Sequence, residues 1–206
     1  MTLPRNAPTP TDDRFALAIL CTANRFRSPI CAGHLRLLTA GLPVEVRSAA
    51  VAGPGGARAL ARARDLAAAS GVDLTAHRAR PLTGGELAEA DLVLGFEQSH
   101  VAAAVVDGGA PRERAFTLPE FVLLAEALPV PSEDDPVRRA RLVAAGAAAR
   151  RAASSAANPP ELPDPVGGPP HGYDDAARAL ERLSARLARV LFGVSAKRPT
   201  ASAREA

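Results

Sequence analysis

The sequence predicts an α/β fold, in which about four parallel strands form a doubly wound sheet with helices on both faces. Residues 15–20 form a short apolar run that ends in a polar loop, which is typical of a strand buried on both sides. Ser28 and Pro29 follow that loop and favour a helix start, with serine as the N-cap. Further along the chain, strand-like and helix-like segments alternate, which indicates a parallel sheet.

The remaining elements are expected in the same alternating order. The four expected strands span residues 15–20, 44–48, 91–95 and 114–118. The expected helices span residues 29–40, 57–70, 84–90, 98–106, 119–127 and 172–192. The last of these has the clearest amphipathic spacing, with Ala176, Leu180, Leu183, Leu187 and Leu191 on one face. Ligands of such sheets bind at the carboxyl ends of the strands, which is where the loop after residue 20 would lie.

Three stretches differ in composition from this core. Residues 1–13 are rich in proline, threonine and aspartate and are expected to be a disordered arm, as is the polar tail at 194–206. Residues 14–193 are expected to form a single domain. Within it, residues 129–159 are interpreted as an inserted helical excursion on the surface, because the helix expected at 137–156 is rich in alanine and arginine and poor in large apolar side chains.

Composition excludes several classes of function. The chain has 206 residues, a net charge of +3 and only 3% aromatic residues, without the dense basic stripe and interleaved aromatics typical of nucleic-acid binding. It has no apolar run of membrane-spanning length and no apolar signal core near the start, so we expect a cytoplasmic protein with neither nucleic-acid nor membrane partners. The two cysteines suit neither a structural disulfide nor a metal set, and we expect no metal and no cofactor.

The loop from Cys21 to Arg27 has the features of an anion site. A strand, a tight loop and a helix N-terminus together direct backbone N–H groups and a partial positive charge at one point. The same donors would favour the thiolate of Cys21, which is the nucleophilic form, and would hold phosphate oxygens against the sulfur. Arg27 can bind two such oxygens. Asn24 suits a left-handed backbone position, and Ser28 could donate a hydrogen bond to the sulfur.

This loop resembles the phosphate loop of the low-molecular-weight protein tyrosine phosphatases, including their bacterial members. The matching residues are Cys21, Asn24, Arg27, Ser28 and Pro29. The resemblance covers about residues 15–127 and 160–192, and it implies a flavodoxin-like sheet and phosphomonoester hydrolysis through a phosphocysteine intermediate. The implied substrate is a phosphorylated protein, above all a phosphotyrosine protein, and the oligomeric state is left open. The implied substrate-binding residues are Thr22, Ala23, Asn24, Arg25, Phe26, Arg27 and Ser28.

Besides a nucleophile, hydrolysis of a phosphate ester through a thiol needs an acid for the leaving oxygen and then a base for the attacking water. Asp164, between two prolines, could supply both from a restrained loop. An Asp-Pro loop before the last helix is where the resembled family has its general acid, so the implied catalytic residues are Cys21, Arg27 and Asp164. By the same resemblance, Ser28, Ser48 and His77 support the loop, with Ser48 bonding Asn24. The other histidines, His34, His100 and His171, are left without a role.

Some residues depart from the family pattern. Ala23 stands where the loop usually has glycine, and Phe26 stands where many members have a second, protective cysteine. Cys31, on the helix that follows, is the other cysteine that could take this role. Val166 follows the Asp-Pro pair where an aromatic often stacks on the phosphotyrosine ring, which puts the aryl preference in question. Phe26 or Tyr173 could compensate.

Two other functions remain open from the sequence. An arsenate reductase that uses an external small thiol would need only Cys21, although the Asp164 loop then has no leaving group to protonate. A non-catalytic phosphate-binding interaction module is the other alternative, and the intact set of Cys21, Arg27 and Asp164 argues against it.

Overall fold

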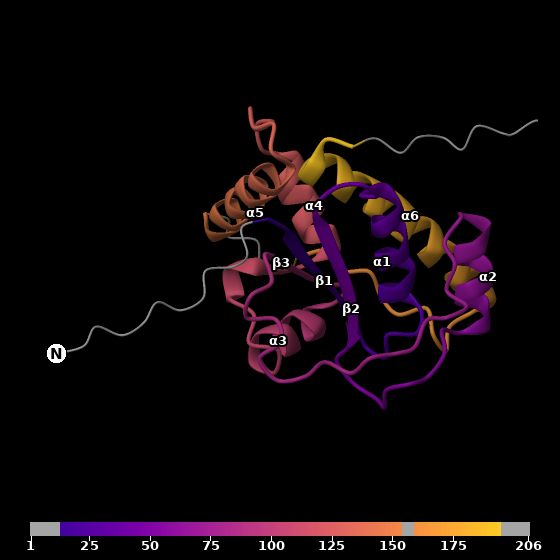
Figure 1. The fold of residues 1–206 in the computed structure, drawn as a ribbon. Coiled ribbons are helices and arrows are strands. Elements are labelled where there is room, and N and C mark those ends of the chain that lie inside the picture. The colour runs from indigo at the N-terminus through magenta and orange to yellow at the C-terminus, as the bar shows by residue number, and fades with distance from the viewer. Residues whose placement is uncertain (1–12, 154–158, 195–206) are drawn as a thin grey trace, which may run out of the picture.

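The fold was determined as a computed structural model, and it describes residues 13–153 and 159–194. Four parallel strands form one sheet in the order β2-β1-β3-β4, which confirms the predicted fold class (Figure 1). The strands are β1 (Phe15–Cys21), β2 (Val44–Ala50), β3 (Leu92–Gly95) and β4 (Ala115–Thr117). The helices are α1 (Arg27–Leu38), α2 (Ala61–Ala69), α3 (Gln98–Val106), α4 (Leu118–Glu126), α5 (Pro136–Ala152) and α6 (Pro170–Phe192), with a 3-10 turn, η1, at Arg112–Arg114.

Helices cover both faces of the sheet. Alternate side chains of β1, among them Phe15, Leu17 and Ile19, pack into a large core that includes buried residues of α1, α4, α5 and α6. Ala18 and Leu20 face the opposite way, into a smaller core with α3. Because β1 is buried on both faces, its sequence is an almost continuous apolar run, and its carboxyl end is held rigidly where the predicted loop begins.

Three predicted helices differ from the observed ones. Residues 84–90 form successive turns rather than a helix, because Gly85 has a left-handed φ of 74° and short i to i+3 bonds replace the helical ladder. The second helix begins at Ala61 rather than at residue 57, since Leu60 N–H donates to Arg25 C=O and Arg58 bridges Arg78. The first helix begins at Arg27, so Ser28 is not its N-cap.

The helix predicted at 137–156 is α5, and its placement corrects the interpretation as a surface excursion. One face of α5 is buried against α4, α6 and β1. The buried side chains are Val137, Ala140, Val143, Ala144 and Ala147. Small alanine side chains build this interface, which explains why composition alone pointed to the surface. The single-domain boundaries remain a prediction. The disordered segments expected at 1–13 and 194–206 lie outside the described residues, apart from Asp13 and Val194.

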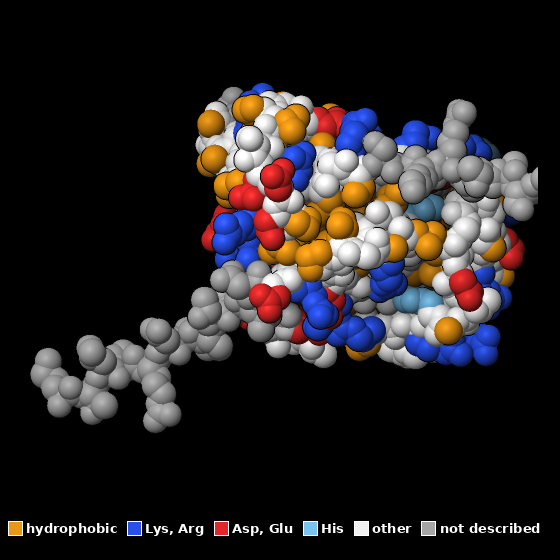
Figure 2. All heavy atoms as spheres, turned by 45° about the horizontal axis from the view of Figure 1, so that its top comes forward, with side chains coloured by type: hydrophobic (Ala, Val, Ile, Leu, Met, Phe, Trp, Pro, Cys, Tyr) orange, Lys and Arg blue, Asp and Glu red, His pale blue; other side chains and the backbone are white. Residues whose placement is uncertain are grey.

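Charges of both signs are distributed over the surface. On the face drawn in Figure 2, arginine side chains are interspersed with acidic ones. Arg186 and Arg189, for example, both pair with Glu126. Among the described helices, none is both long enough and apolar enough to cross a membrane.

Candidate active site

The site lies at the carboxyl end of β1, where the chain turns into α1. Cys21 is the last residue of β1, and its Sγ lies 3.0 Å from Ser28 Oγ. Asn24 Nδ2 donates to the same Ser28 oxygen at 2.7 Å. Because Ser28 accepts this bond, its own hydroxyl proton is available to Cys21, and the serine can stabilise a thiolate. This use of the hydroxyl also explains why Ser28 does not cap the helix.

Asn24 organises the loop through its backbone and its amide. Its φ is 52°, a left-handed value that asparagine tolerates better than most residues. Besides Ser28, its Nδ2 donates to Ser48 Oγ at 3.0 Å, and its Oδ1 accepts from Arg80 N–H at 3.1 Å. His77 Nε2 donates to Asn24 C=O at 2.8 Å, and burial lowers the pKa of His77. The contacts expected of Ser48 and His77 are therefore present.

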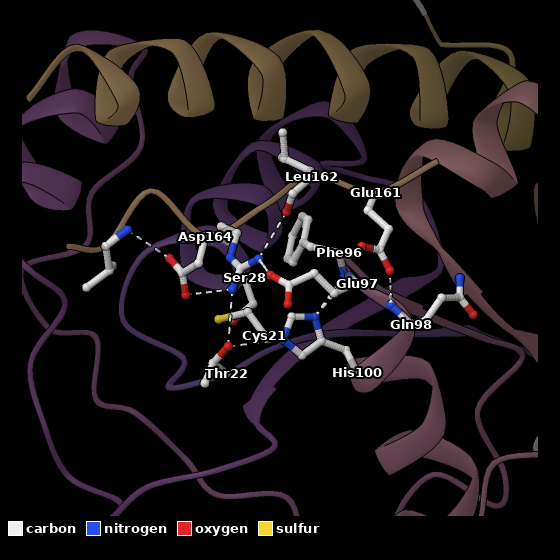
Figure 3. Close-up of polar contacts among 12 residues, drawn as sticks. Cys21, Thr22, Ser28, Phe96, Glu97, Gln98, His100, Glu161, Leu162 and Asp164 are labelled. Carbon is white, nitrogen blue, oxygen red and sulfur yellow. Dashed lines mark hydrogen bonds and ion pairs between the residues drawn. The ribbon is translucent and has the colours of Figure 1, made fainter. Parts of the chain in front are cut away.

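Arg27 is the most buried charged side chain in the site, with 1% exposure. Its Nη1 donates to Glu97 Oε1 and, at 3.0 Å, to the Leu162 carbonyl. Its Nη2 donates to Thr22 Oγ1 at 3.1 Å and to Asp164 Oδ2 at 2.6 Å (Figure 3). A buried guanidinium needs paired charge and satisfied donors, and two carboxylates supply both. These contacts hold the Arg27 guanidinium in one position within the loop.

His100, to which the sequence assigned no role, contacts the loop of residues 21–28, called the catalytic loop below. His100 Nδ1 accepts from the backbone N–H groups of Phe96, at 3.2 Å, and Glu97, at 3.1 Å. The ring proton is therefore on Nε2, which lies 3.2 Å from Thr22 Oγ1 and donates to it. Burial, and then the charge of Arg27, lower the pKa of His100, so the ring stays neutral. Gly95 makes room, since a Cβ there would lie 2.5 Å from His100 Cβ.

Thr22 is consequently left with one free hydrogen-bonding group. Its Oγ1 accepts from both His100 and Arg27, so the hydroxyl proton is the part that remains for a ligand. The residue is exposed and lies beside Cys21, and its hydroxyl would meet an oxygen of a bound phosphoryl group.

Asp164 reaches the site from an otherwise exposed loop. Its Oδ1 accepts from Val166 N–H at 3.1 Å, while Oδ2 is bonded to Arg27. The loop is attached just before this point, because Leu162 N–H donates to Phe96 C=O at 2.8 Å. The structure thus brings Asp164, from late in the sequence, onto Arg27 in the loop that begins at Cys21, and Figure 3 shows Asp164 and Cys21 on the same side of that loop. These are the three residues predicted to be catalytic.

The loop residues predicted to bind substrate do not all offer their side chains. Asn24 and Phe26 are buried, whereas Thr22, Ala23 and Arg25 are exposed. Phe26 makes an edge-to-face contact with Tyr173 at 5.3 Å between ring centres and has 3% exposure. Its ring therefore belongs to the core and does not replace the missing aromatic wall. Val166 is 51% exposed.

Cys31 is a packed thiol in α1. Burial raises its pKa to about 12, and Ser184 Oγ donates to its sulfur at 3.4 Å. A thiol with this pKa stays protonated and reacts slowly, so Cys31 does not replace the protective cysteine whose position Phe26 occupies.

Sequence reasoning missed Glu97, the second carboxylate on Arg27, and the role of His100. Both follow β3, the strand beside β1. The carboxyl ends of neighbouring parallel strands meet at one edge, so a polar pair directly after β3 could have been expected near the Cys21 loop.

Comparisons with known proteins agree with this geometry. Residues 16–141 match the family model described as low molecular weight phosphotyrosine protein phosphatase. The low molecular weight protein-tyrosine-phosphatase Etp of Escherichia coli strain K12 is 38% identical over 127 residues, which are 61% of this chain and 80% of Etp.

Solved structures extend the similarity over most of the chain. A low molecular weight protein tyrosine phosphatase from T. tengcongensis aligns with a TM-score of 0.61 and 26% identity, covering 84% of this chain and 97% of that one. The YwlE arginine phosphatase from Geobacillus stearothermophilus aligns with a TM-score of 0.62 and 26% identity, over 85% and 91% of the two chains. The chain therefore belongs to the low molecular weight phosphotyrosine protein phosphatase family.

Proposed function

We propose that this protein hydrolyses phosphotyrosine in proteins through a phosphocysteine formed on Cys21. The observation that carries the proposal is the convergence of three groups at the end of β1. The sulfur has the Ser28 hydroxyl at 3.0 Å, and the buried Arg27 lies in the same loop. Asp164 lies 2.6 Å from that guanidinium, close enough to serve a leaving group bound in the loop.

In the first step, the Cys21 thiolate attacks phosphorus and the bond between phosphorus and the ester oxygen breaks. Asp164 gives its proton to the leaving oxygen, while Arg27 and the loop N–H groups stabilise the equatorial oxygens. In the second step, Asp164 takes a proton from water, which attacks phosphorus and breaks the S–P bond. Ser28 donates to the departing thiolate. Inorganic phosphate and free Cys21 are the products.

Substrate binding requires a rearrangement at Arg27. Both terminal nitrogens of Arg27 have partners in the structure, and one partner of Nη2 is Asp164. Nη2 donates to both Thr22 and Asp164, and we infer that a phosphate bound to the guanidinium through two oxygens replaces the Asp164 carboxylate. The displaced carboxylate is then free to take up a proton from solvent and to approach the ester oxygen as the acid, so phosphate binding and placement of the acid are coupled.

Phosphoarginine is the second candidate substrate. The solved structures that resemble this chain include two YwlE arginine phosphatases, at 27% and 26% identity. The side chains exposed next to Cys21 are Thr22 and Ala23. Val166 is exposed on the loop that carries Asp164 (residues 159–169, the acid loop). None of these three side chains has a ring that could stack on an aryl group. The description of the family favours phosphotyrosine. A nucleophilic free thiol suits a reducing compartment, so we propose a cytoplasmic location.

The test compares four substrates in a chelating buffer: an aryl phosphate and peptides with phosphotyrosine, phosphoserine or phosphoarginine. We expect phosphotyrosine to be hydrolysed at least ten times faster than phosphoserine, and the Cys21→Ser variant to be inactive on all four. A clear preference for phosphoarginine would mean that phosphoarginine, and not phosphotyrosine, is the substrate, while the phosphocysteine mechanism would stand. Turnover by Cys21→Ser, or arsenate reduction with glutathione in place of hydrolysis, would contradict the proposal.

A further inference from the structure

We propose that three arginines beside the catalytic loop, Arg25, Arg58 and Arg78, bind acidic residues that flank the phosphorylated residue of the substrate protein. We call these three residues the arginine strip. The proposal rests on the proposed function, because it concerns the protein substrate of the same site. It adds a preference for substrates with acidic sequence around the phosphorylated position.

The arginine strip is continuous with the catalytic loop. Arg25 belongs to that loop, and its Nε donates to the Arg58 carbonyl at 3.0 Å. Leu60 N–H donates to the Arg25 carbonyl, also at 3.0 Å, which fixes the two segments side by side. Arg58 and Arg78 then form an isolated antiparallel bridge, so their side chains stand opposite one another. All three arginines are exposed.

This arrangement carries an uncompensated cost. Like charges directly opposite one another on paired strands destabilise a protein. Neighbouring arginines have acidic partners: Arg62 pairs with Asp174, and Arg80 pairs with Glu86. Within residues 13–153 and 159–194, no ion pair includes a residue of the arginine strip. A bound carboxylate would relieve the repulsion that the fold leaves in place.

The strip also has hydrogen-bond donors to offer. Arg25 uses only Nε within the described structure, which leaves both terminal nitrogens for a ligand. Arg78 uses Nη1 on the His77 and Thr75 carbonyls and keeps Nη2. The guanidinium of Arg58 makes no hydrogen bond to any described residue. Planar guanidinium groups with free donors suit aspartate and glutamate side chains, which they can bind bidentately.

The geometry separates this surface from the chemistry. Arg58 and Arg78 lie outside the catalytic loop, and neither contacts Cys21, Arg27 or Asp164 in the hydrogen bonds of the described residues. An aryl phosphate without a peptide would therefore not reach them. Their contribution should be confined to KM for peptides, and it should weaken with salt because the charges are exposed.

The experiment measures kcat/KM for two phosphotyrosine peptides, one with Asp and Glu around the phosphotyrosine and one with Asn and Gln. The test variant is Arg58→Ser/Arg78→Ser. The matched control is Arg138→Ser/Arg150→Ser, which removes the same charge from two exposed positions of α5. An aryl phosphate is assayed in parallel, and binding of both peptides to the Cys21→Ser variant is measured by fluorescence anisotropy, with and without the Arg58 and Arg78 changes.

We expect wild-type protein and the control to favour the acidic peptide about tenfold at low salt, through KM, and much less at 0.5 M salt. The test variant should reduce the preference to less than twofold while aryl phosphate hydrolysis stays unchanged. An equal preference in the test variant, or none in wild type, would overturn the inference and leave the proposed function intact. If no phosphate ester is hydrolysed, the proposed function fails, and the anisotropy measurement alone decides whether the strip binds acidic peptides.

Discussion

The two halves of the active site are built in different ways. The catalytic loop, residues 21–28, lies between a buried strand and a buried helix start, and its polar side chains hold one another through Asn24. The acid loop, residues 159–169, is largely exposed. It is attached by Thr117 Oγ1, which donates to the Pro160 carbonyl at 2.6 Å, and by the bond from Leu162 N–H to Phe96. Beyond that point, Asp164 is attached mainly through Arg27.

This difference separates binding from proton transfer. A loop whose buried donors and acceptors are already paired is preorganised for phosphate, so it has little reorganisation to make in the transition state. In the proposed mechanism, the acid loop instead contributes one carboxylate, Asp164, that competes with phosphate for Arg27. Loss of Cys21 or Arg27 from the catalytic loop should therefore cost the most activity, whereas changes in the acid loop should alter rates and ligand affinity in opposite directions.

The largest effect is expected from Arg27→Lys. A lysine cannot make the four contacts of the guanidinium, and it would leave Glu97 or Asp164 poorly paired. We expect kcat/KM for an aryl phosphate to fall about 10³-fold, the scale of losing a major oxyanion donor. Arg36→Lys is the matched control, since among the residues that the structure describes Arg36 donates only to the Val46 carbonyl. A loss of less than tenfold would contradict the inference that the catalytic loop and Arg27 are preorganised to bind phosphate.

The next largest effect is expected from Asp164→Ala, which should lower kcat and raise the affinity for inorganic phosphate. Loss of the acid should lower kcat about 10²- to 10³-fold for esters with poor leaving groups. The same change removes the competitor for Arg27, so inorganic phosphate should inhibit the variant at lower concentrations than it inhibits wild type. Steady-state inhibition measures both. Weaker phosphate binding in the variant would show that Asp164 and phosphate do not compete.

Asn24→Ala tests the internal support of the catalytic loop. It removes three side-chain hydrogen bonds and places alanine at a φ of 52°. We expect the free energy of unfolding to fall by about 1–3 kcal/mol, measured by urea denaturation, and activity to fall with it. Asn24→Gly isolates the hydrogen bonds, because glycine accepts this φ freely. Equal stability of wild type and Asn24→Ala would contradict the account.

The smallest effect is expected at Thr22, whose hydroxyl is directed by His100. Thr22→Val should lower phosphate affinity and kcat/KM by about threefold to tenfold, the value of one hydrogen bond, whereas Thr22→Ser should keep both. His100→Asn can still accept from the backbone N–H groups of Phe96 and Glu97 but cannot reach Thr22. Its effect should disappear in the Thr22→Val background, as a double-mutant cycle would show. Additive effects would mean that His100 acts independently of Thr22.

The sequence was sufficient where function depends on local pattern. It predicted the four strands from apolar runs and their spacing, an anion site from the Cys21–Arg27 loop and, through the resemblance to the phosphatase family, Asp164, which does contact Arg27. It failed where tertiary contacts decide. Glu97 and His100 act because β3 pairs with β1, which no local pattern shows. Ser28 has a good N-cap sequence, but its hydroxyl serves Asn24 and Cys21 instead.

Two further differences have similar causes. The glycines at 84 and 85 broke a helix that the surrounding residues favoured. In α5, alanines form a buried interface although their side chains are too small to stand out as a core pattern.

The most direct test of the central claim is a search for the covalent intermediate. Wild-type protein is mixed with an excess of aryl phosphate, quenched in acid within milliseconds, and its peptides are analysed by mass spectrometry while the released phenol is followed. We expect a phenol burst approaching one equivalent of enzyme and one phosphoryl group on the peptide that contains Cys21. Neither should be seen with Cys21→Ala, which has no nucleophile at this position. A phosphoryl group on any other residue, or steady turnover by Cys21→Ala, would contradict the mechanism.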